Sequence, residues 1–225
     1  GDNVTKKKGF EQWYSLGRGG CHYYAADLFE DGKLNISKEY VTDLITEKAL
    51  NYLEDMSKQE EPFYLSIHYT APHSPWNKEE HPKQYRSIYE ECKFEATPQL
   101  PVHKNQINTC PVGDTPEKRK EYLQGYYAAI TAMDSGIGRI LDKIEQEGIE
   151  QDTVVIFTSD NGMNMGHHGV WGKGNGTYPP NMYDSSIKVP FLIYLPDNAQ
   201  KGRVCHNRAS QYDIFPTILE LAGCN

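Results

Sequence analysis

The apolar positions of this chain follow two periodicities, one typical of helices and one typical of strands. Apolar residues recur every three or four positions along residues 37–58, 115–148 and 210–222, and this spacing predicts three amphipathic helices. Ser37 is the expected N-cap of the first helix, and Thr115 with its following proline is the expected start of the second. Each helix therefore needs a partner that covers its apolar face.

Three short runs rich in β-branched and aromatic residues, at 63–68, 153–159 and 189–195, predict strands. Because strands alternate with helices, we expect an α/β fold with a mainly parallel sheet sandwiched by helices. Residues 1–36 are rich in glycine, aromatic and charged residues and predict an irregular surface segment. The prolines and polar residues of 77–114 predict a long excursion between two elements.

The length and charge of the chain limit its architecture and its partners. The 225 residues suffice for one large domain with a sizeable core, and the formal net charge is −8. An acidic chain is a poor partner for nucleic acid or an anionic membrane, so neither is expected, and an anionic substrate needs a local positive pocket. No apolar run approaches the roughly 20 residues that a helix needs to cross a bilayer, so no membrane span is expected.

The cysteines carry little chemical information. They are widely spaced and include no Cys-x-x-Cys pair: Cys21, Cys92, Cys110, Cys205 and Cys224. An odd number of dispersed cysteines indicates mostly free thiols, which favours a reducing, cytoplasmic setting but leaves the compartment open. The chain does not begin with Met, so its first residues say nothing about targeting.

Two polar groups directly follow predicted strands. Asp160 and Asn161 come after the strand at 153–159, and their carboxylate and carboxamide oxygens suit a hard cation such as Ca²⁺ or Mg²⁺. His73 lies in a proline-rich turn after the strand at 63–68. Because ligands bind beyond the carboxyl ends of the strands in parallel sheets, we expect both groups at one edge of the sheet.

A glycine-rich loop at 166–174 follows the Asp-Asn pair and carries His168 and Lys173. Its glycines allow backbone and side-chain donors to approach an anion closely. Metal-binding oxygens beside cationic donors are typical of a site for a sulfate or phosphate ester. Plainer interpretations remain, since Asp-Asn-Gly favours turns, a histidine beside prolines can cap a turn, and loop lysines are usually solvated.

Several segments, in their order along the chain, resemble the sulfatase family of the alkaline-phosphatase superfamily. They are Ala71-Pro72-His73-Ser74-Pro75, the helix from Tyr127-Ala128-Ala129 to Asp134, Thr158-Ser159-Asp160-Asn161-Gly162, Gly169-Val170-Trp171-Gly172-Lys173-Gly174, Tyr183-Asp184 to Val189-Pro190, and Asp213-Ile214-Phe215-Pro216-Thr217. Each segment alone is short, but their order and spacing extend over most of the chain.

The resemblance implies an alkaline phosphatase/sulfatase-like sheet and the hydrolysis of a sulfate monoester, on either a small molecule or a carbohydrate. It implies that Asp160 and Asn161 are two ligands of a divalent metal, usually Ca²⁺. It also implies that His73 and Lys173 bind sulfate oxygens and assist the leaving group. His168 stands where a subset of the family keeps a histidine near the substrate.

The chain also departs from the family pattern. Sulfatases use a formylglycine made within a Cys/Ser-x-Pro/Ala-x-Arg motif, and none of the five cysteines stands in such a context. The family's early Asp-Asp metal pair and its Gly-Lys-Trp-His segment are also absent, and its small C-terminal subdomain would begin near Asn225. Asp184-Ser185-Ser186-Ile187-Lys188 stands where many members have Glu-Gly-Gly-x-Arg.

We therefore expect residues 1–225 to be a fragment of one sulfatase catalytic domain, inactive without the missing segments of its parent chain, from which the formylglycine would come. Two alternatives stay open. One is a phosphoryl or phosphonate ester hydrolase of the same superfamily, although the two-zinc members have a histidine where this chain has Asn161. The other is a non-catalytic binding or structural module that keeps the scaffold.

Overall fold

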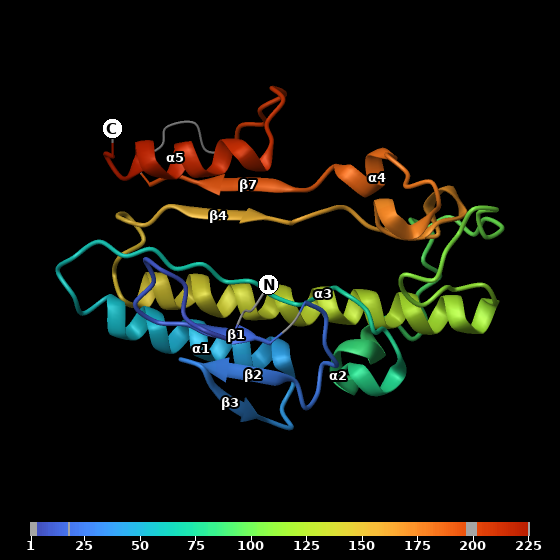
Figure 1. The fold of residues 1–225 in the computed structure, drawn as a ribbon, viewed down its shortest axis with the longest axis horizontal. Helices are drawn as coiled ribbons and strands as arrows, with labels where there is room; N and C mark the ends of the chain where they lie inside the picture. Colours follow the sequence, from blue (N-terminus) through green and yellow to red (C-terminus); the bar gives the residue numbers. More distant parts are fainter. Residues whose placement is uncertain (1–3, 18, 197–201, 225) are drawn as a thin grey trace.

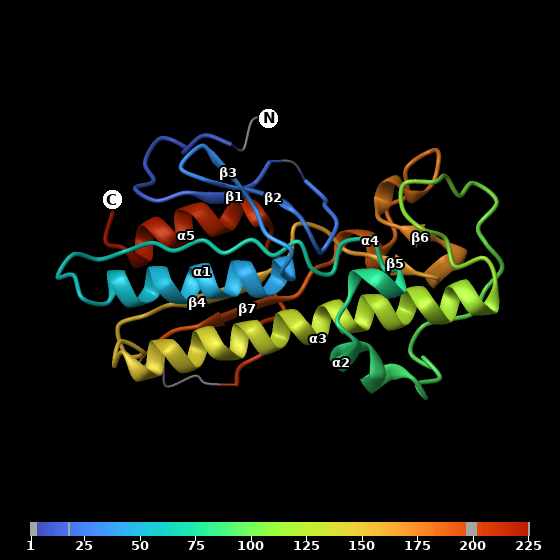
Figure 2. The ribbon, with the colours of Figure 1, turned by 90° about the horizontal axis from the view of Figure 1, so that it is seen from below.

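The protein is described by a computed structural model that covers residues 4–17, 19–196 and 202–224. Two long helices, α1 (Val41–Met56) and α3 (Pro116–Gln146), pack side by side through its centre (Figure 1; Figure 2). Thr115 caps α3 as predicted, since its side-chain oxygen accepts a 3.3 Å hydrogen bond from the backbone N–H of Lys118. The first two of the three predicted helices are therefore confirmed.

The first helix begins later than its expected cap. Its N-cap is Tyr40, whose side chain makes no capping hydrogen bond. The Ser37 hydroxyl instead accepts a 3.1 Å hydrogen bond from the N–H of Glu39, which closes a bend ahead of the helix.

The prediction that residues 1–36 form an irregular surface segment is wrong. Three short strands in this part of the chain form an antiparallel sheet in the order β1-β2-β3, with β1 (Tyr14–Leu16), β2 (Asp27–Glu30) and β3 (Lys33–Ile36). Asp31 and Gly32 join β2 to β3, and their φ angles of 48° and 83° are those of a tight two-residue hairpin. The sheet buries Leu28 in a core cluster with α1 and α3.

The two later strands are confirmed within a few residues of their predicted bounds. β4 (Val155–Thr158) pairs with β7 (Phe191–Tyr194), and Figure 1 shows this pair as a separate layer above α3. The predicted final helix is present as a short turn, η5 (Gln211–Asp213), followed by α5 (Ile214–Leu221) on the outer side of β7.

The expected mainly parallel sheet is not confirmed. Every strand pair in the described part of the chain is antiparallel, including β4 with β7. Residues 63–68 are not assigned as a strand and have no ladder partner there. Their alternate side chains Leu65 and Ile67 still pack on the cluster formed by α1 and α3, as in a strand, but without the predicted pairing. The chain is a partial α/β fold.

The connecting segments contain short elements. Residues 77–114 hold η1 (Lys78–Glu80), α2 (Lys83–Arg86) and η2 (Ser87–Tyr89) before α3. Between β4 and β7 lie β5 (Asn164–Met165), η3 (His167–Gly169), β6 (Trp171–Gly172), η4 (Gly174–Gly176) and α4 (Asp184–Ile187). Among the helices of the described ranges, none combines the length and apolarity that a bilayer crossing requires.

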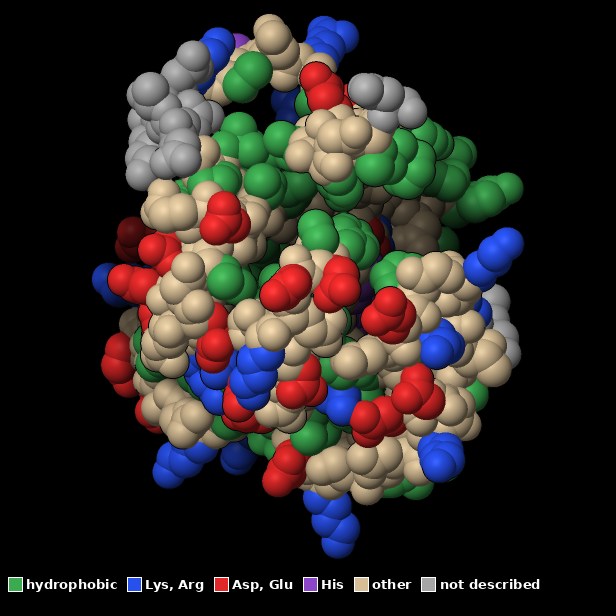
Figure 3. All heavy atoms as spheres, turned by 90° about the vertical axis from the view of Figure 1, so that its left-hand side faces the viewer, with side chains coloured by type: hydrophobic (Ala, Val, Ile, Leu, Met, Phe, Trp, Pro, Cys, Tyr) green, Lys and Arg blue, Asp and Glu red, His purple; other side chains and the backbone are tan. Residues whose placement is uncertain are grey.

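The layer of β4, β7 and α5 leaves a large apolar surface uncovered. All four residues of β7 are exposed, with Leu192 at 65% of its full accessibility, and Phe215 of α5 is 70% exposed. Figure 3 shows hydrophobic side chains gathered on the upper part of this face, where Figure 1 places β7 and α5. A strand of four apolar residues is rarely exposed to solvent in a complete domain, so this surface is suited to packing against a further strand or helix.

Candidate active site

The turn that carries His73 is held by side chains. Its four consecutive carbonyl oxygens each accept a side-chain hydrogen bond: Pro72 from Trp76 Nε1 (2.9 Å), His73 from the Tyr23 hydroxyl (2.8 Å), Ser74 from His73 Nδ1 (2.7 Å) and Pro75 from His81 Nε2 (3.0 Å). Two of the four residues are prolines, which have no N–H to offer, so backbone hydrogen bonds alone cannot define this turn.

The His73 imidazole has a defined orientation. Because the Ser74 carbonyl can only accept, the hydrogen bond between them places a proton on His73 Nδ1. The other ring nitrogen, Nε2, is then available for a ligand, and the residue as a whole is exposed. The ring also lines a cavity of about 280 Å³ between the turn and residues 16–17 and 20–27.

Asp160 and Asn161 follow the end of β4 in a loop fixed by backbone contacts. The Gly162 N–H donates a 3.0 Å hydrogen bond to the carbonyl of Ser186, and the Gln211 side chain donates to the carbonyls of Ser159 (2.7 Å) and Asp160 (2.9 Å). These bonds fix the backbone and leave the Asp160 carboxylate exposed.

The two side chains offer hard oxygens, so they fit part of a Ca²⁺ or Mg²⁺ shell. The Asn161 side-chain N–H donates to the Gly162 carbonyl (2.9 Å), which leaves its amide oxygen for a cation. The Asp160 carboxylate receives one long contact of 3.5 Å from Ser159 and enters no ion pair within the described ranges. No group of three or more His, Cys, Asp or Glu side chains that could hold a metal lies in those ranges, so these two residues supply an incomplete ligand set.

A buried polar network connects this loop to Lys173. Asn164 is fully buried and pairs with Gly172 in the β5–β6 ladder, one residue before Lys173. Its side-chain N–H groups donate to the Gly172 carbonyl (3.0 Å) and the Ser186 hydroxyl (2.7 Å), and its oxygen accepts from Ser185. Ser185 and Ser186 are therefore structural partners of Asn164.

Lys173 is half-buried beside Cys110. Burial raises the pKa of the Cys110 thiol to about 11, and the nearby Lys173 ammonium opposes this shift. Among the described residues Lys173 forms no ion pair, so its charge is available to an anion.

His168 lies on the same loop but in a different setting. It has a left-handed backbone (φ 57°), is exposed, and its ring stacks on Tyr183 with centroids 4.0 Å apart. The neighbouring His167 is partly buried, and burial together with His168 lowers its pKa. Its Nδ1 atom is buried and has no hydrogen-bond partner among the residues that the structure describes.

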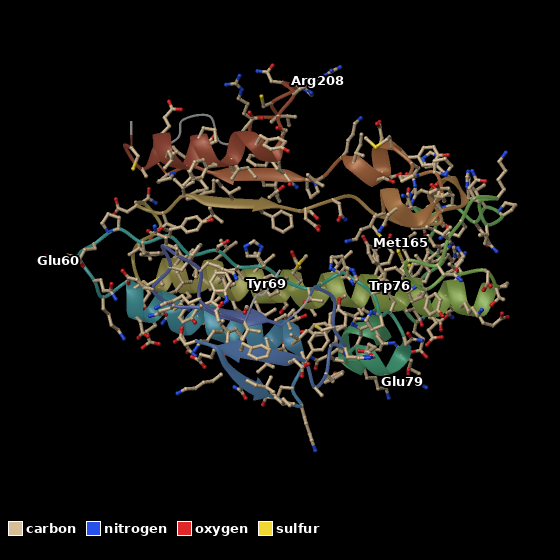
Figure 4. All side chains as sticks on the ribbon, in the orientation of Figure 1. Glu60, Tyr69, Trp76, Glu79, Met165 and Arg208 are labelled. Atoms are coloured by element: carbon tan, nitrogen blue, oxygen red, sulfur yellow. The ribbon has the colours of Figure 1, made fainter. Side chains whose placement is uncertain are left out.

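The five predicted site residues belong to two units that meet on α3. The His73 turn ends in Trp76, and Lys173 follows Trp171; both tryptophans are buried in one cluster with Leu123 of α3. The Tyr122 ring contacts both, with centroid distances of 6.4 Å to each. Figure 4 shows Trp76 and Met165, another member of this cluster, beside the same half of α3. No hydrogen bond or ion pair joins the five side chains directly within the described ranges.

Comparisons with known proteins identify the family of the chain. A family model described as Sulfatase matches residues 1–224. The chain belongs to the sulfatase family. An endo-4-O-sulfatase of Bacteroides thetaiotaomicron is 31% identical over 223 residues, which cover 97% of this chain and 41% of that protein.

Solved structures share the fold of this sulfatase chain. A structure described as a complex with its substrate D-glucosamine-2-N,6-O-disulfate has a TM-score of 0.79 at 24% identity and covers 99% of this chain and 57% of its own. A phosphonate monoester hydrolase from Silicibacter pomeroyi has a TM-score of 0.68 at 22% identity, over 82% of this chain and 38% of its own. At these identities the likeness shows the alkaline phosphatase-like fold. The chain spans 50%, 41% and 40% of the length of three curated relatives that it matches.

Residues that organise this candidate site were missed from the sequence. Gln106 bonds both backbone groups of Trp171, at 2.9 Å to its N–H and 2.8 Å to its carbonyl, as a neighbouring strand would. Asn164 and Tyr23 are fully buried yet polar. No local motif marks these positions. Tyr23 and Gln106 bond segments that are 50 and 65 residues away along the chain. Asn164 bonds Gly172, 8 residues away across a loop, and Ser186, 22 residues away.

Proposed function

We propose that residues 1–225 form the central to C-terminal part of the catalytic domain of a sulfatase that hydrolyses sulfate monoesters of carbohydrates. The observation that carries this proposal is the connection of the His73 turn and the Lys173 loop through Tyr122. It holds on one support an imidazole and an ammonium that forms no ion pair with the described residues. Membership of the sulfatase family supports the type of reaction.

The carbohydrate class is supported by the relatives. The matched protein from Bacteroides thetaiotaomicron is named an endo-4-O-sulfatase, and the matched complex holds a sulfated glucosamine. A sulfated sugar also suits the exposed position of His73, since its leaving alcohol can extend away from the turn.

In this proposal, His73 and Lys173 act on the sulfate group. The Lys173 ammonium binds sulfate oxygens and offsets their negative charge. The Ser74 carbonyl holds the proton on His73 Nδ1, so the proton that the charged ring can give away is the one on Nε2. Transfer of that proton to the departing alkoxide oxygen gives the alcohol and leaves a neutral imidazole. His168, stacked on Tyr183, contacts the sugar beyond the sulfate group.

Asp160 and Asn161 would hold the divalent cation, for which Ca²⁺ is favoured over Mg²⁺. When bound, this cation would supply positive charge next to the sulfate oxygens. The remaining oxygen ligands and the formylglycine would come from segments of the parent outside residues 1–225.

The exposed surface of β7 and α5 supports the fragment interpretation. Phe191, Leu192, Ile193 and Tyr194 are all exposed, although their sequence is that of a buried strand. Curated relatives are about twice as long as the chain or longer. We infer that further strands and helices of the parent cover this surface, in a sheet that includes parallel pairs.

The test is an assay of the full-length parent, produced with a formylglycine-generating enzyme, on 6-O-sulfated glucosamine. We expect Lys173→Ala and His73→Ala each to reduce kcat/KM by about 10²–10³-fold, since each removes charge stabilisation or proton transfer. Lys188→Ala is the matched control, because Lys188 is 72% exposed and pairs with Asp184 at 2.6 Å. Unchanged sulfate release by Lys173→Ala would overturn the assignment, and a parent that begins near Gly1 would favour a non-catalytic module.

A phosphonate or phosphoryl ester hydrolase is the second candidate, supported by the structural likeness to a phosphonate monoester hydrolase. Asn161 argues against a two-zinc site, because an amide oxygen is a poorer zinc ligand than imidazole. Faster hydrolysis of a phosphonate monoester than of the sulfate ester by the same parent would favour this candidate.

A further inference from the structure

The backbone of the His73 turn is held by two buried side chains from separate segments. Tyr23, which follows β1, is completely buried and donates its hydroxyl to the His73 carbonyl at 2.8 Å. His81, which follows η1, is 3% exposed and bonds the Pro75 carbonyl at 3.0 Å. Neither residue belongs to the chemistry proposed above.

Both the backbone and the ring of Tyr23 are held by neighbouring residues. Its N–H donates to the Glu80 carboxylate at 2.8 Å, and its carbonyl accepts from the Val41 N–H at 2.8 Å. Its ring stacks on Tyr40 with centroids 5.4 Å apart and lies 4.4 Å from the His81 ring. The phenolic hydroxyl therefore reaches the His73 carbonyl from a position set by the core.

The protonation state of His81 follows from its two partners. The Pro75 carbonyl can only accept, so Nε2 of His81 carries the proton, and Nδ1 accepts from the Tyr40 hydroxyl at 3.0 Å. Burial lowers the pKa of His81 to about 4, so the ring stays neutral near pH 7. His81 is therefore a steady donor to the turn.

These bonds anchor the peptide groups on both sides of the Ser74 carbonyl, which is the acceptor for His73 Nδ1–H. With the His73 and Pro75 carbonyls fixed, the Ser74 carbonyl between them has little freedom to rotate away. We propose that Tyr23 and His81 are positioning residues for His73, which hold its proton on Nδ1 and so direct Nε2 toward the ligand. The role of Nε2 in this inference rests on the proposed function. The positioning of the His73 ring rests on the hydrogen bonds alone.

The test measures the tautomer of His73 in the chain itself. Chain labelled with ¹⁵N-histidine is examined by NMR at about pH 9, where imidazoles are neutral, and the His73 signals are assigned with His73→Gln. Wild-type protein is expected to carry the His73 proton mainly on Nδ1. Tyr23→Phe is expected to reduce the ratio of the Nδ1–H to the Nε2–H form roughly fivefold, as for the weakening of one neutral hydrogen bond.

Two further variants separate positioning from packing. His81→Phe removes the second donor and should shift the ratio in the same direction, whereas His81→Gln keeps an N–H donor and should restore part of it. Tyr24→Phe is the matched control, because Tyr24 also lies beside Tyr40, at 5.5 Å between centroids, and no hydrogen bond of its hydroxyl is found in the described residues.

The outcomes are distinct. The proposal is overturned if Tyr23→Phe and His81→Phe lower the melting temperature but leave the His73 tautomer as in wild type, or if wild-type His73 carries its proton on Nε2. If Tyr23→Phe does not fold, the pair His81→Phe and His81→Gln decides. A failure of the proposed function would instead appear as unchanged sulfate release by His73→Ala, which does not affect the tautomer measurement.

Discussion

A methyl group added to Gly162 would lie 2.2 Å from the carbonyl oxygen of Ser185. This close approach lets the loop that carries Asp160 and Asn161 pack directly on the backbone of α4. We expect Gly162→Ala to lower the free energy of unfolding by about 1–3 kcal/mol, because the loop and α4 must separate. Urea denaturation of the chain measures this change.

A second glycine provides the control for that substitution. Gly138 lies within α3, and an added methyl group there would meet no atom within 4 Å. Gly138→Ala should therefore stabilise the chain by about 0.5–1 kcal/mol through the backbone preference alone. Equal effects of the two substitutions would show that the contact with Ser185 carries no strain.

If Asp160 is a metal ligand, the Ca²⁺ affinity of the full-length parent depends on the negative charge of its carboxylate. Asp160→Asn keeps the shape of the side chain but removes a negative oxygen ligand, so we expect Ca²⁺ affinity to fall at least about tenfold. Isothermal titration calorimetry with calcium chloride measures the affinity without an assay of activity. Asp152→Asn is the control, because Asp152 is an exposed residue of the same chain ahead of β4. Equal affinity in Asp160→Asn and wild type would remove Asp160 from the metal site.

His81 predicts a specific dependence of stability on acid. Its pKa is about 4 in the folded chain, against an ordinary value of 6.5, so as the pH falls the unfolded chain takes up the proton first. The stability that the neutral ring contributes is complete above about pH 6.5 and declines toward pH 4, by about 2 kcal/mol at pH 5.

Urea denaturation at pH 7.5 and pH 5 tests this dependence against His81→Gln, which cannot titrate. The wild type should lose about 2 kcal/mol more than the variant. An equal loss in wild type and His81→Gln would mean that the buried ring is not kept neutral by the fold.

The uncovered face of β7 predicts different effects in the short and the long protein. In the chain alone, Leu192→Ser should change the free energy of unfolding by less than about 0.5 kcal/mol, because this side chain is 65% exposed, and should reduce binding of a hydrophobic dye. In the full-length parent the same substitution should cost about 2–4 kcal/mol, since the leucine would be buried.

Ile88 offers a comparison outside this face. It is 60% exposed on η2, and Ile88→Ser should have the small effect in both proteins. A small effect of Leu192→Ser in the full-length parent would show that β7 stays uncovered there.

The sequence predicted the elements whose signals are local. Thr115 and Pro116 marked the start of α3 because capping and proline preference act within one turn. The N-terminal sheet was missed although Asp31-Gly32 is a hairpin signal, because the flanking strands have only three or four residues and no long alternating pattern. The run at 63–68 was predicted as a strand from its apolar and aromatic residues, but pairing depends on a neighbour that the local sequence does not specify.

The site was predicted only as far as motifs reach. The sequence named His73 and Lys173 from the segments around them, and these assignments stay predictions. It did not identify Tyr23, His81 or Gln106. Tyr23 and Gln106 act through hydrogen bonds to residues more than 40 positions away. His81 acts through a buried hydrogen bond to the Pro75 carbonyl. Such roles require three-dimensional proximity, which no local spacing records.

The ring of Tyr122 between Trp76 and Trp171 has a consequence for the whole molecule. The distance between the two proposed sulfate-binding side chains is set by a helix that carries neither of them. One turn of that helix also contains Gly125, where an added methyl group would lie 2.1 Å from the Trp76 carbonyl oxygen. In the proposed enzyme, Gly125→Ala would therefore shift the His73 turn relative to the Lys173 loop. Activity would fall although every reacting side chain is still present.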